Sequence, residues 1–138
     1  MEKFLRMYRN LHADNLEILK TVYRQDIHFT DPAHQISGID NLTAYFAALY
    51  ANIDSIHFSF LEPLMVDNKG YVRWEMTFSH RRLDGGRPIT VAGASYLEFD
   101  QQGKVHFHQD YFDLGAMLYE HVPLLGRFVR SIKKGLGK

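Results

Sequence analysis

The chain contains no cysteine and no excess of charge of either sign. The lack of cysteine excludes disulfides, thiolate metal sites and a cysteine nucleophile. Sixteen basic and sixteen acidic side chains cancel, so no overall field favours nucleic acid as a partner. No stretch approaches membrane-spanning length, and the first residues lack the apolar run of a signal peptide. These absences predict a soluble, cytoplasmic protein.

The 138 residues are 46% hydrophobic, which is enough for one domain with a real core. Aromatic residues make up 14% of the chain, and this content suits an apolar pocket or a sheet interface equally well. We expect one domain over residues 1–122, followed by a separate segment over residues 123–138.

Three helices are predicted in the first half of the chain. Residues 2–12 have apolar side chains at helical spacing, namely Phe4, Met7, Tyr8 and Leu11. Asp14 and Glu17 are spaced as a capping box that opens a second helix, whose buried stripe is Leu16, Leu19, Val22 and Tyr23. A third helix begins near Gly38 and Asp40 and turns inward Leu42, Tyr45, Phe46 and Leu49.

The rest of the chain alternates apolar and polar residues as strands do. Strands are predicted over residues 27–31, 56–65 (broken by Pro63), 70–80, 89–99 and 105–114, with turns at 84–88 and 100–103. Helices followed by an antiparallel meander predict an α+β domain with the helices on one face of the sheet.

The strand over residues 105–114 carries the most informative pattern. Alternate side chains point to opposite faces, so one face holds His106, His108, Asp110 and Phe112, and the other Val105, Phe107, Gln109, Tyr111 and Asp113. If the first face lines a cavity, its imidazoles and carboxylate can transfer protons. Asp113 is expected to end the strand and cap the next helix.

Over roughly residues 3 to 118 the chain resembles the NTF2-like (SnoaL-like) superfamily. The most specific pieces are Phe29-Thr-Asp31-Pro32-Ala-His34 and Gly103-Lys-Val…Asp110-Tyr-Phe-Asp113. The resemblance implies a cone in which a strongly bent, mostly antiparallel sheet wraps around the N-terminal helices and encloses a deep apolar pocket. Because this superfamily hosts enzymes and non-catalytic domains alike, the reaction must be argued from the site.

Two enzyme groups of that superfamily offer catalytic positions. Asp31 is similar in place to the general base of the ketosteroid isomerases, and Asp110 to a catalytic carboxylate of the limonene-epoxide hydrolases. The oxyanion donors of the first group are missing, since Ser95 and Met7 stand in their places. Two charged members of the second correspond to Met76 and Phe78, so neither reaction is expected.

The predicted pocket therefore has its own composition. Its candidate catalytic residues are Asp110, Asp31 and His108, and its candidate ligand contacts are Trp74, Met76, Phe78, Ser95, Leu97, Phe112, His34 and Tyr45. Each polar candidate has a structural alternative: Asp31 could cap a turn, Asp110 could form a structural pair, and His108 could be a satisfied core imidazole. No cofactor and no metal are expected.

The end of the chain forms a basic amphipathic segment. Residues 121–138 contain no Asp or Glu, and their apolar residues Leu125, Phe128, Val129, Ile132 and Leu136 fall at helical intervals. The segment could contact an anionic membrane or an acidic partner. The favoured alternative packs its apolar stripe over the cone or on a second subunit.

A homodimer is expected, because the outward faces of the last strands carry Tyr96, Val105, Phe107 and Tyr111. The sequence favours a protein that binds a small apolar or aromatic molecule, and its first functional hypothesis is a cofactor-independent isomerase, cyclase, dehydratase or hydrolase. The alternatives are a non-catalytic binding or sensing module and an interaction domain that acts through the basic tail.

Overall fold

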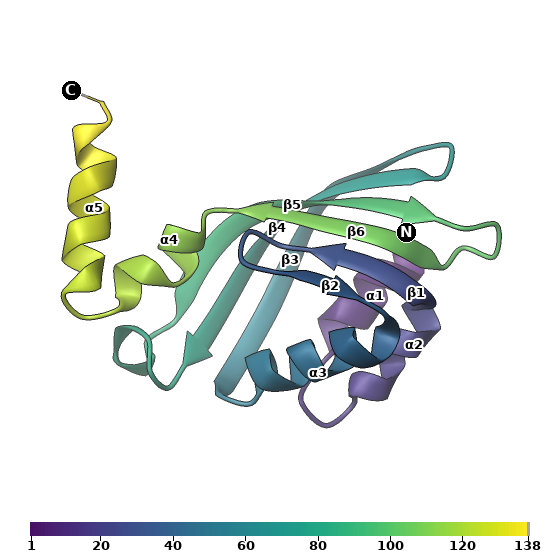
Figure 1. Ribbon diagram of the computed structural model, residues 1–138, viewed down its shortest axis with the longest axis horizontal. Coiled ribbons are helices and arrows are strands. Elements are labelled where there is room, and N and C mark those ends of the chain that lie inside the picture. The colour runs from purple at the N-terminus through teal and green to yellow at the C-terminus, as the bar shows by residue number, and fades with distance from the viewer. Residues whose placement is uncertain (138) are drawn as a thin grey trace.

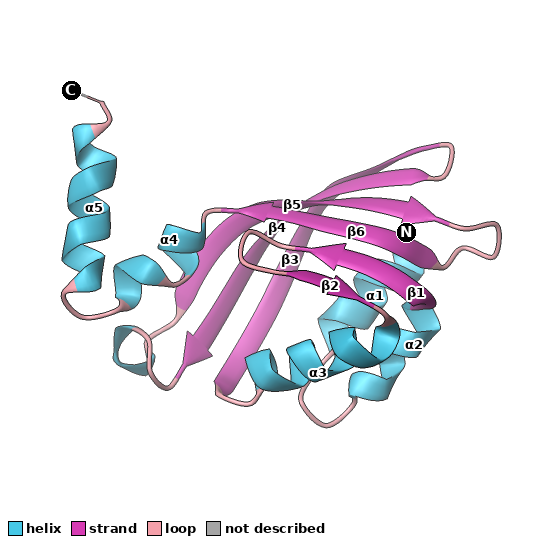
Figure 2. Cartoon of the chain, viewed as in Figure 1, coloured by secondary structure: helices cyan, strands magenta, loops and turns pink. Residues whose placement is uncertain are grey.

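A computed structural model describes residues 1–137 and shows helices packed under one bent sheet (Figure 1). The N-terminal helices lie on the concave side of a six-stranded open sheet (Figure 2). Residues from both layers form the core, and its fully buried members include Leu19, Ile27, Leu42 and Leu97. The predicted α+β cone is confirmed.

The first and third helices lie where the apolar spacing predicts them. Helix α1 (Glu2–Asn10) buries Phe4, Leu5, Met7 and Tyr8. Helix α3 (Ile39–Tyr50) follows Gly38, whose φ of 88° is a backbone conformation that glycine adopts without strain. Leu49 is exposed and contributes to a cavity wall, not to the core.

The predicted second helix is wrong in two respects. It is a 3₁₀ turn, η1 (Leu16–Ile18), followed by the four-residue α2 (Leu19–Val22), because Tyr23 already begins a strand. The capping box does not form either. Asn15 occupies the N-cap of η1, and its side chain accepts a hydrogen bond from the His12 N–H (2.7 Å).

The sheet has the order β2-β1-β6-β5-β4-β3, in which only the β1–β6 pair is parallel. Its strands are β1 (Tyr23–Thr30), β2 (Gln35–Ser37), β3 (Ile53–Val66), β4 (Lys69–His80), β5 (Ile89–Phe99) and β6 (Val105–Phe112). A short turn, η2 (Asp84–Gly86), joins β4 to β5. Pro63 does not break β3, since an edge strand tolerates proline at an irregularity, here between Leu61 and Leu64.

A bulge in β6 changes one predicted side-chain direction. Glu98 of β5 pairs with Phe107, but the next residue, Phe99, pairs with Val105, so His106 is the extra residue. Val105 therefore turns into the core and is fully buried, and the prediction that it faces outward is wrong.

The C-terminal part leaves the sheet in three short pieces. They are α4 (Leu114–Met117), η3 (Tyr119–His121) and α5 (Leu125–Gly135), the last of which lies within the predicted amphipathic segment. Asp113 caps α4 as predicted, because its carboxylate accepts the Ala116 N–H (3.2 Å). Helix α5 projects from the domain (Figure 1), so its apolar stripe does not pack over the cone as the favoured prediction allowed. Among residues 1–137, no helix is long and apolar enough to cross a membrane.

Candidate functional site

A cavity of about 270 Å³ lies between the helices and the concave face of the sheet. Aromatic rings from both layers line it, among them Phe29, Phe46, Phe58, Trp74, Phe78 and Phe112. A cavity of about 150 Å³ can hold benzene. The space is therefore large enough for a substituted ring or a compact two-ring molecule.

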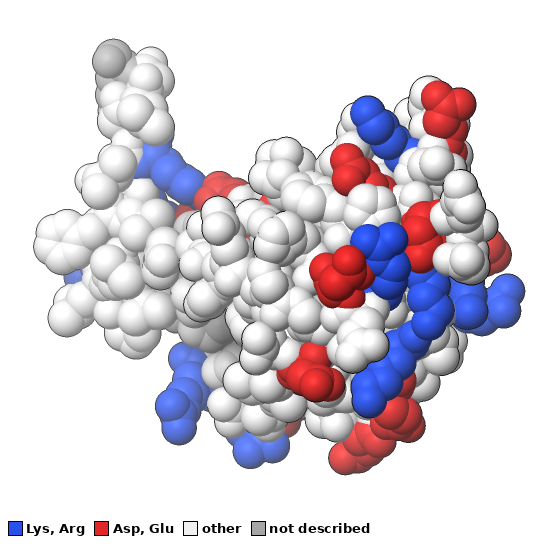
Figure 3. Space-filling model, turned by 45° about the vertical axis from the view of Figure 1, so that its right-hand side comes forward, with Lys and Arg blue, Asp and Glu red and all other residues white. Residues whose placement is uncertain are grey.

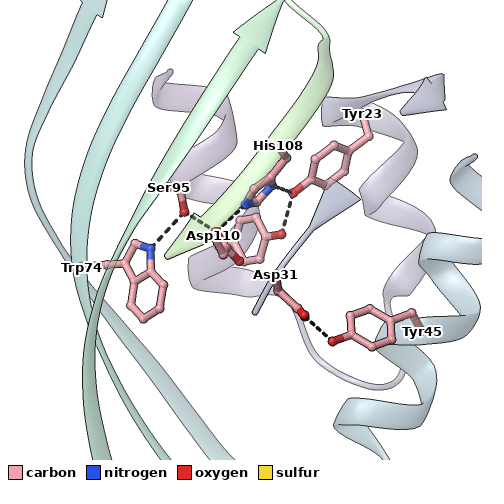
Figure 4. A network of polar contacts seen from close by, with 8 residues as sticks. Tyr23, Asp31, Tyr45, Trp74, Ser95, His108 and Asp110 are labelled. Atoms are coloured by element: carbon pink, nitrogen blue, oxygen red, sulfur yellow. Dashed lines mark hydrogen bonds and ion pairs between the residues drawn. The ribbon is translucent and has the colours of Figure 1, made fainter. Parts of the chain in front are cut away.

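Polar groups of the sheet converge on Asp110 at the inner end of β6 (Figure 4). Asp110 Oδ1 lies 2.6 Å from Nε2 of His108 and accepts a hydrogen bond from the Ser95 hydroxyl at 2.5 Å. The Ser95 oxygen in turn accepts the indole N–H of Trp74 (2.9 Å). Strand alternation and the β4–β5–β6 pairing bring these side chains together, since Ser95 pairs directly with Asp110.

His108 continues the network into the core. Its Nδ1 lies 2.7 Å from the Tyr23 hydroxyl, which lies 2.5 Å from the Tyr8 hydroxyl. An ionised Asp110 only accepts, so Nε2 carries the hydrogen and Nδ1 of a neutral imidazole must accept. Tyr8 then donates to Tyr23, Tyr23 donates to His108, and His108 donates to Asp110.

Both phenols of this hydrogen-bond network, Tyr8 and Tyr23, are buried. Burial raises the pKa of Tyr8 and of Tyr23 well above the usual value of a phenol, and the charge of Asp110 raises both further. They remain neutral hydrogen-bonding groups over the ordinary pH range, which keeps the orientation of His108 fixed.

Asp31 lies at a second polar point of the cavity and is held by its own turn. Its Oδ1 accepts the backbone N–H groups of Ala33 and His34 (2.8 Å each), as an Asp before a proline turn commonly does. Its Oδ2 accepts the hydroxyl of Tyr45. Burial, and then this hydrogen bond, raise the pKa of Tyr45.

The structure brings most of the sequence candidates to one cavity. Those that line it are Asp31, Tyr45, Trp74, Met76, Phe78, Ser95, His108, Asp110 and Phe112. His34 is exposed, with Nδ1 3.2 Å from the Tyr45 hydroxyl, and lies outside the lining. Leu97 is buried in the core beside His108 and does not line the cavity, so the prediction that it forms a wall is wrong.

The sequence interpretation missed the hydrogen bonds that join Tyr8 to Tyr23 and Tyr23 to His108. Both were expected only as apolar faces of helices. A buried phenol needs a hydrogen-bond partner, and that need was the available signal. The bond between Tyr23 and His108 was not visible, because it depends on the parallel pairing of β1 with β6.

No group of three or more metal-binding side chains gathers within residues 1–137. Of the acidic and imidazole groups that line the cavity, Asp110 and His108 are bonded to each other.

Comparisons with known proteins give a family and a fold. Residues 4–108 match the SnoaL-like domain family. No curated protein matches the chain. Among solved structures, an NTF2-like protein of unknown function from Burkholderia pseudomallei K96243 is 17% identical, with a TM-score of 0.74 over 86% of this chain and 93% of that chain.

Two further solved structures have the same fold and were determined with small molecules. A protein with a ketosteroid isomerase-like fold from Catenulispora acidiphila DSM 44928, in complex with trimethylamine, is 19% identical, with a TM-score of 0.70 over 79% of this chain and 84% of that one. TerC, co-crystallised with polyporic acid, is 14% identical, with a TM-score of 0.72 over 84% of this chain and 91% of that one.

Proposed function

Because the chain belongs to the SnoaL-like domain family, we propose that it binds a small apolar or aromatic molecule and transfers a proton on it without a cofactor. The observation that carries this proposal is the position of Asp110, a carboxylate at the wall of a cavity lined mainly by apolar side chains. A carboxylate in such surroundings is costly unless it is paired, and here it is paired on one oxygen.

The pairing leaves Asp110 able to act as a base. Both donors, from His108 and Ser95, reach Oδ1, and no hydrogen bond within residues 1–137 reaches Oδ2. Oδ2 can take a proton from a bound molecule and return it to another atom of that molecule. Isomerisation and ring closure need only this internal transfer, whereas dehydration and hydrolysis also release or take up water.

Asp31 and Tyr45 then serve to orient the ligand. Three donors already bind the Asp31 carboxylate and reach both of its oxygens, so neither oxygen is as open to a ligand proton as Oδ2 of Asp110. The Tyr45 hydroxyl lies at the same wall and offers an oxygen to a polar group of the ligand. The complexes of the two relatives with polyporic acid and with trimethylamine support a small organic ligand in this fold.

A thermal-shift comparison tests the binding part of this proposal. A panel of aromatic hydroxyketones with one or two rings is screened against the wild type, Asp110→Asn and Asp67→Asn. Asp67 is the matched control, because it is exposed in the β3–β4 turn at a φ of 53°, which Asn tolerates.

We expect ligands that raise the melting temperature of the wild type and the control but raise that of Asp110→Asn much less. A ligand at a hundred times its Kd stabilises by about 2.7 kcal/mol, a rise on the order of 8 °C for a chain of this size. Equal shifts for all three proteins would place the ligand away from Asp110 and refute the proposal.

A further inference from the structure

Helix α5 presents an apolar stripe to solvent. Leu124, Phe128, Ile132 and Leu136 are 72%, 68%, 67% and 83% exposed. Phe128 and Ile132 are four residues apart and therefore lie along one side of the helix, and Leu124 and Leu136 stand at its two caps. Isolated exposed leucines are common on proteins, but a continuous stripe of this kind marks an interaction surface.

The opposite side of α5 holds the helix on the domain by polar contacts. The Lys133 ammonium donates to the Asp113 carboxylate and to Glu120 Oε2 (2.7 Å). The Arg130 guanidinium donates to the Glu120 carbonyl oxygen. Gly126 is the buried residue of the helix, and a Cβ there would collide with the backbone of Glu120. These contacts turn the apolar stripe outward.

The charge beside the stripe is of one sign. Residues 121–138 contain no acidic side chain. Two cations, Arg127 and Lys134, are exposed and lie outside the contacts that hold the helix. Figure 3 shows mostly uncharged surface at the end of the molecule that carries α5, in contrast to the charged opposite end.

We propose that α5 docks on an anionic lipid surface, with its apolar stripe in the interface and with Arg127 and Lys134 at the headgroups. An amphipathic helix with a basic polar side binds in this way, and long basic side chains reach the headgroup level while the apolar side is buried. Pairing with α5 of a second copy is less favourable, because it would bring together two helices that carry only positive charge.

The test is co-sedimentation of the full chain with vesicles. Vesicles of phosphatidylcholine with phosphatidylglycerol are compared with vesicles of phosphatidylcholine alone, for the wild type and for a Phe128→Ser/Ile132→Ser variant. A Met65→Ser/Val66→Ser variant is the matched control, because these two exposed apolar residues lie on β3 and not on α5. Circular dichroism verifies that each variant is folded.

We expect the wild type and the control to bind the anionic vesicles and to dissociate as salt is raised. The Phe128→Ser/Ile132→Ser variant should bind the vesicles at least about tenfold more weakly than the wild type. The Arg127→Gln/Lys134→Gln variant should lose the preference for anionic lipid. Either absence of wild-type binding or equal binding by the α5 variant overturns the proposal. If the wild type is a dimer that does not bind vesicles, and the α5 variant is a monomer, the stripe is assigned to a contact with a second copy.

Discussion

Trp74 is the single tryptophan of the chain, and its ring lies over Gly93 of the neighbouring strand. A Cβ at position 93 would come within 2.5 Å of the indole Cζ2 atom. The missing side chain thus makes room for a ring that both lines the cavity and donates to Ser95.

Gly93→Ala is expected to displace this ring and to lower the free energy of unfolding by about 1–3 kcal/mol. Urea denaturation followed by tryptophan fluorescence measures both effects, since the emission comes from the cavity wall alone. The control is Gly135→Ala on α5, where an added Cβ meets nothing within 4 Å. Unchanged fluorescence and stability in Gly93→Ala would contradict the close packing of the Trp74 ring on Gly93.

The Tyr8–Tyr23–His108 chain predicts unequal costs for two similar substitutions. Tyr23→Phe leaves Nδ1 of the buried His108 without its partner and should cost about 1–3 kcal/mol. Tyr8→Phe keeps that bond and should cost about 0.5–1.5 kcal/mol. Denaturant unfolding of both variants measures the difference, and a larger loss for Tyr8→Phe would reverse the proposed donor order.

The same phenols make stability sensitive to alkaline pH. Their pKa is raised in the folded protein, so above about pH 10 the unfolded chain has released protons that the folded chain still holds. Their contribution to stability is full below that pH and declines as pH rises above it. Melting temperatures from pH 8 to 11 should fall less steeply in Tyr8→Phe/Tyr23→Phe than in the wild type.

At this scale the sequence predicted which residues gather but not how they bond. Alternation along β6 was enough to place His108, Asp110 and Phe112 on one face. It could not show that both carboxylate oxygens of Asp31 accept hydrogen bonds, from the backbone of its own turn and from Tyr45. That outcome depends on side-chain geometry across two elements.

Among the elements, α5 is held to the segment before it in part by Lys133, which contacts Asp113 and Glu120. The neighbouring Lys133 ammonium lowers the pKa of Asp113, so this contact contributes stability above the ordinary pKa of an Asp and loses it as pH falls. Asp113 also caps α4, which links the two helices through a single carboxylate.

Lys133→Gln should therefore loosen α5 without unfolding the domain. Hydrogen–deuterium exchange by mass spectrometry should be faster over residues 125–135 and unchanged over β4 and β5. Lys134→Gln is the control, because it removes the same charge from the same helix outside the contact with Asp113. Equal exchange in the two variants would mean that the Lys133 pair does not hold the helix.

Elements with a long, clear period were predictable, and irregular ones were not. The apolar spacing of α1 and α3 located both helices. The bulge at His106 was not visible, because its register is set by β5 and β1 together. The prediction of the second helix was wrong because the position of Tyr23 in the sequence fits the apolar stripe of a helix as well as it fits a strand.

On the scale of the whole molecule, the convex face of the sheet carries a second hollow. This shallow groove of about 580 Å³ is lined in part by Tyr71, Tyr96, Phe107 and Tyr111. Tyr71 and Tyr111 are exposed, and their apolar rings favour coverage by another protein surface. We propose that two copies pair through this face.

Light scattering after size exclusion should then give about 32 kDa, twice the 16.1 kDa of the chain. Tyr111→Glu should shift the mass to that of one chain, because it buries a charge in each half of the interface. Gln102→Glu adds the same charge in an exposed turn and should leave the dimer intact.

We also propose that residues 1–122 form the folded domain and that residues 123–138 are dispensable for its folding.

The most direct test of proton transfer at Asp110 is the exchange of deuterium from solvent into a cavity ligand. A ketone that shifts the melting temperature is incubated in D₂O with the wild type, Asp110→Asn or Asp67→Asn, and its acidic C–H positions are followed by NMR. We predict rapid exchange with the wild type and the control, and exchange slower by about 10²–10⁴-fold with Asp110→Asn. Binding by the wild type with neither faster exchange nor conversion of the ketone to an isomer would contradict catalysis and leave a ligand-binding protein.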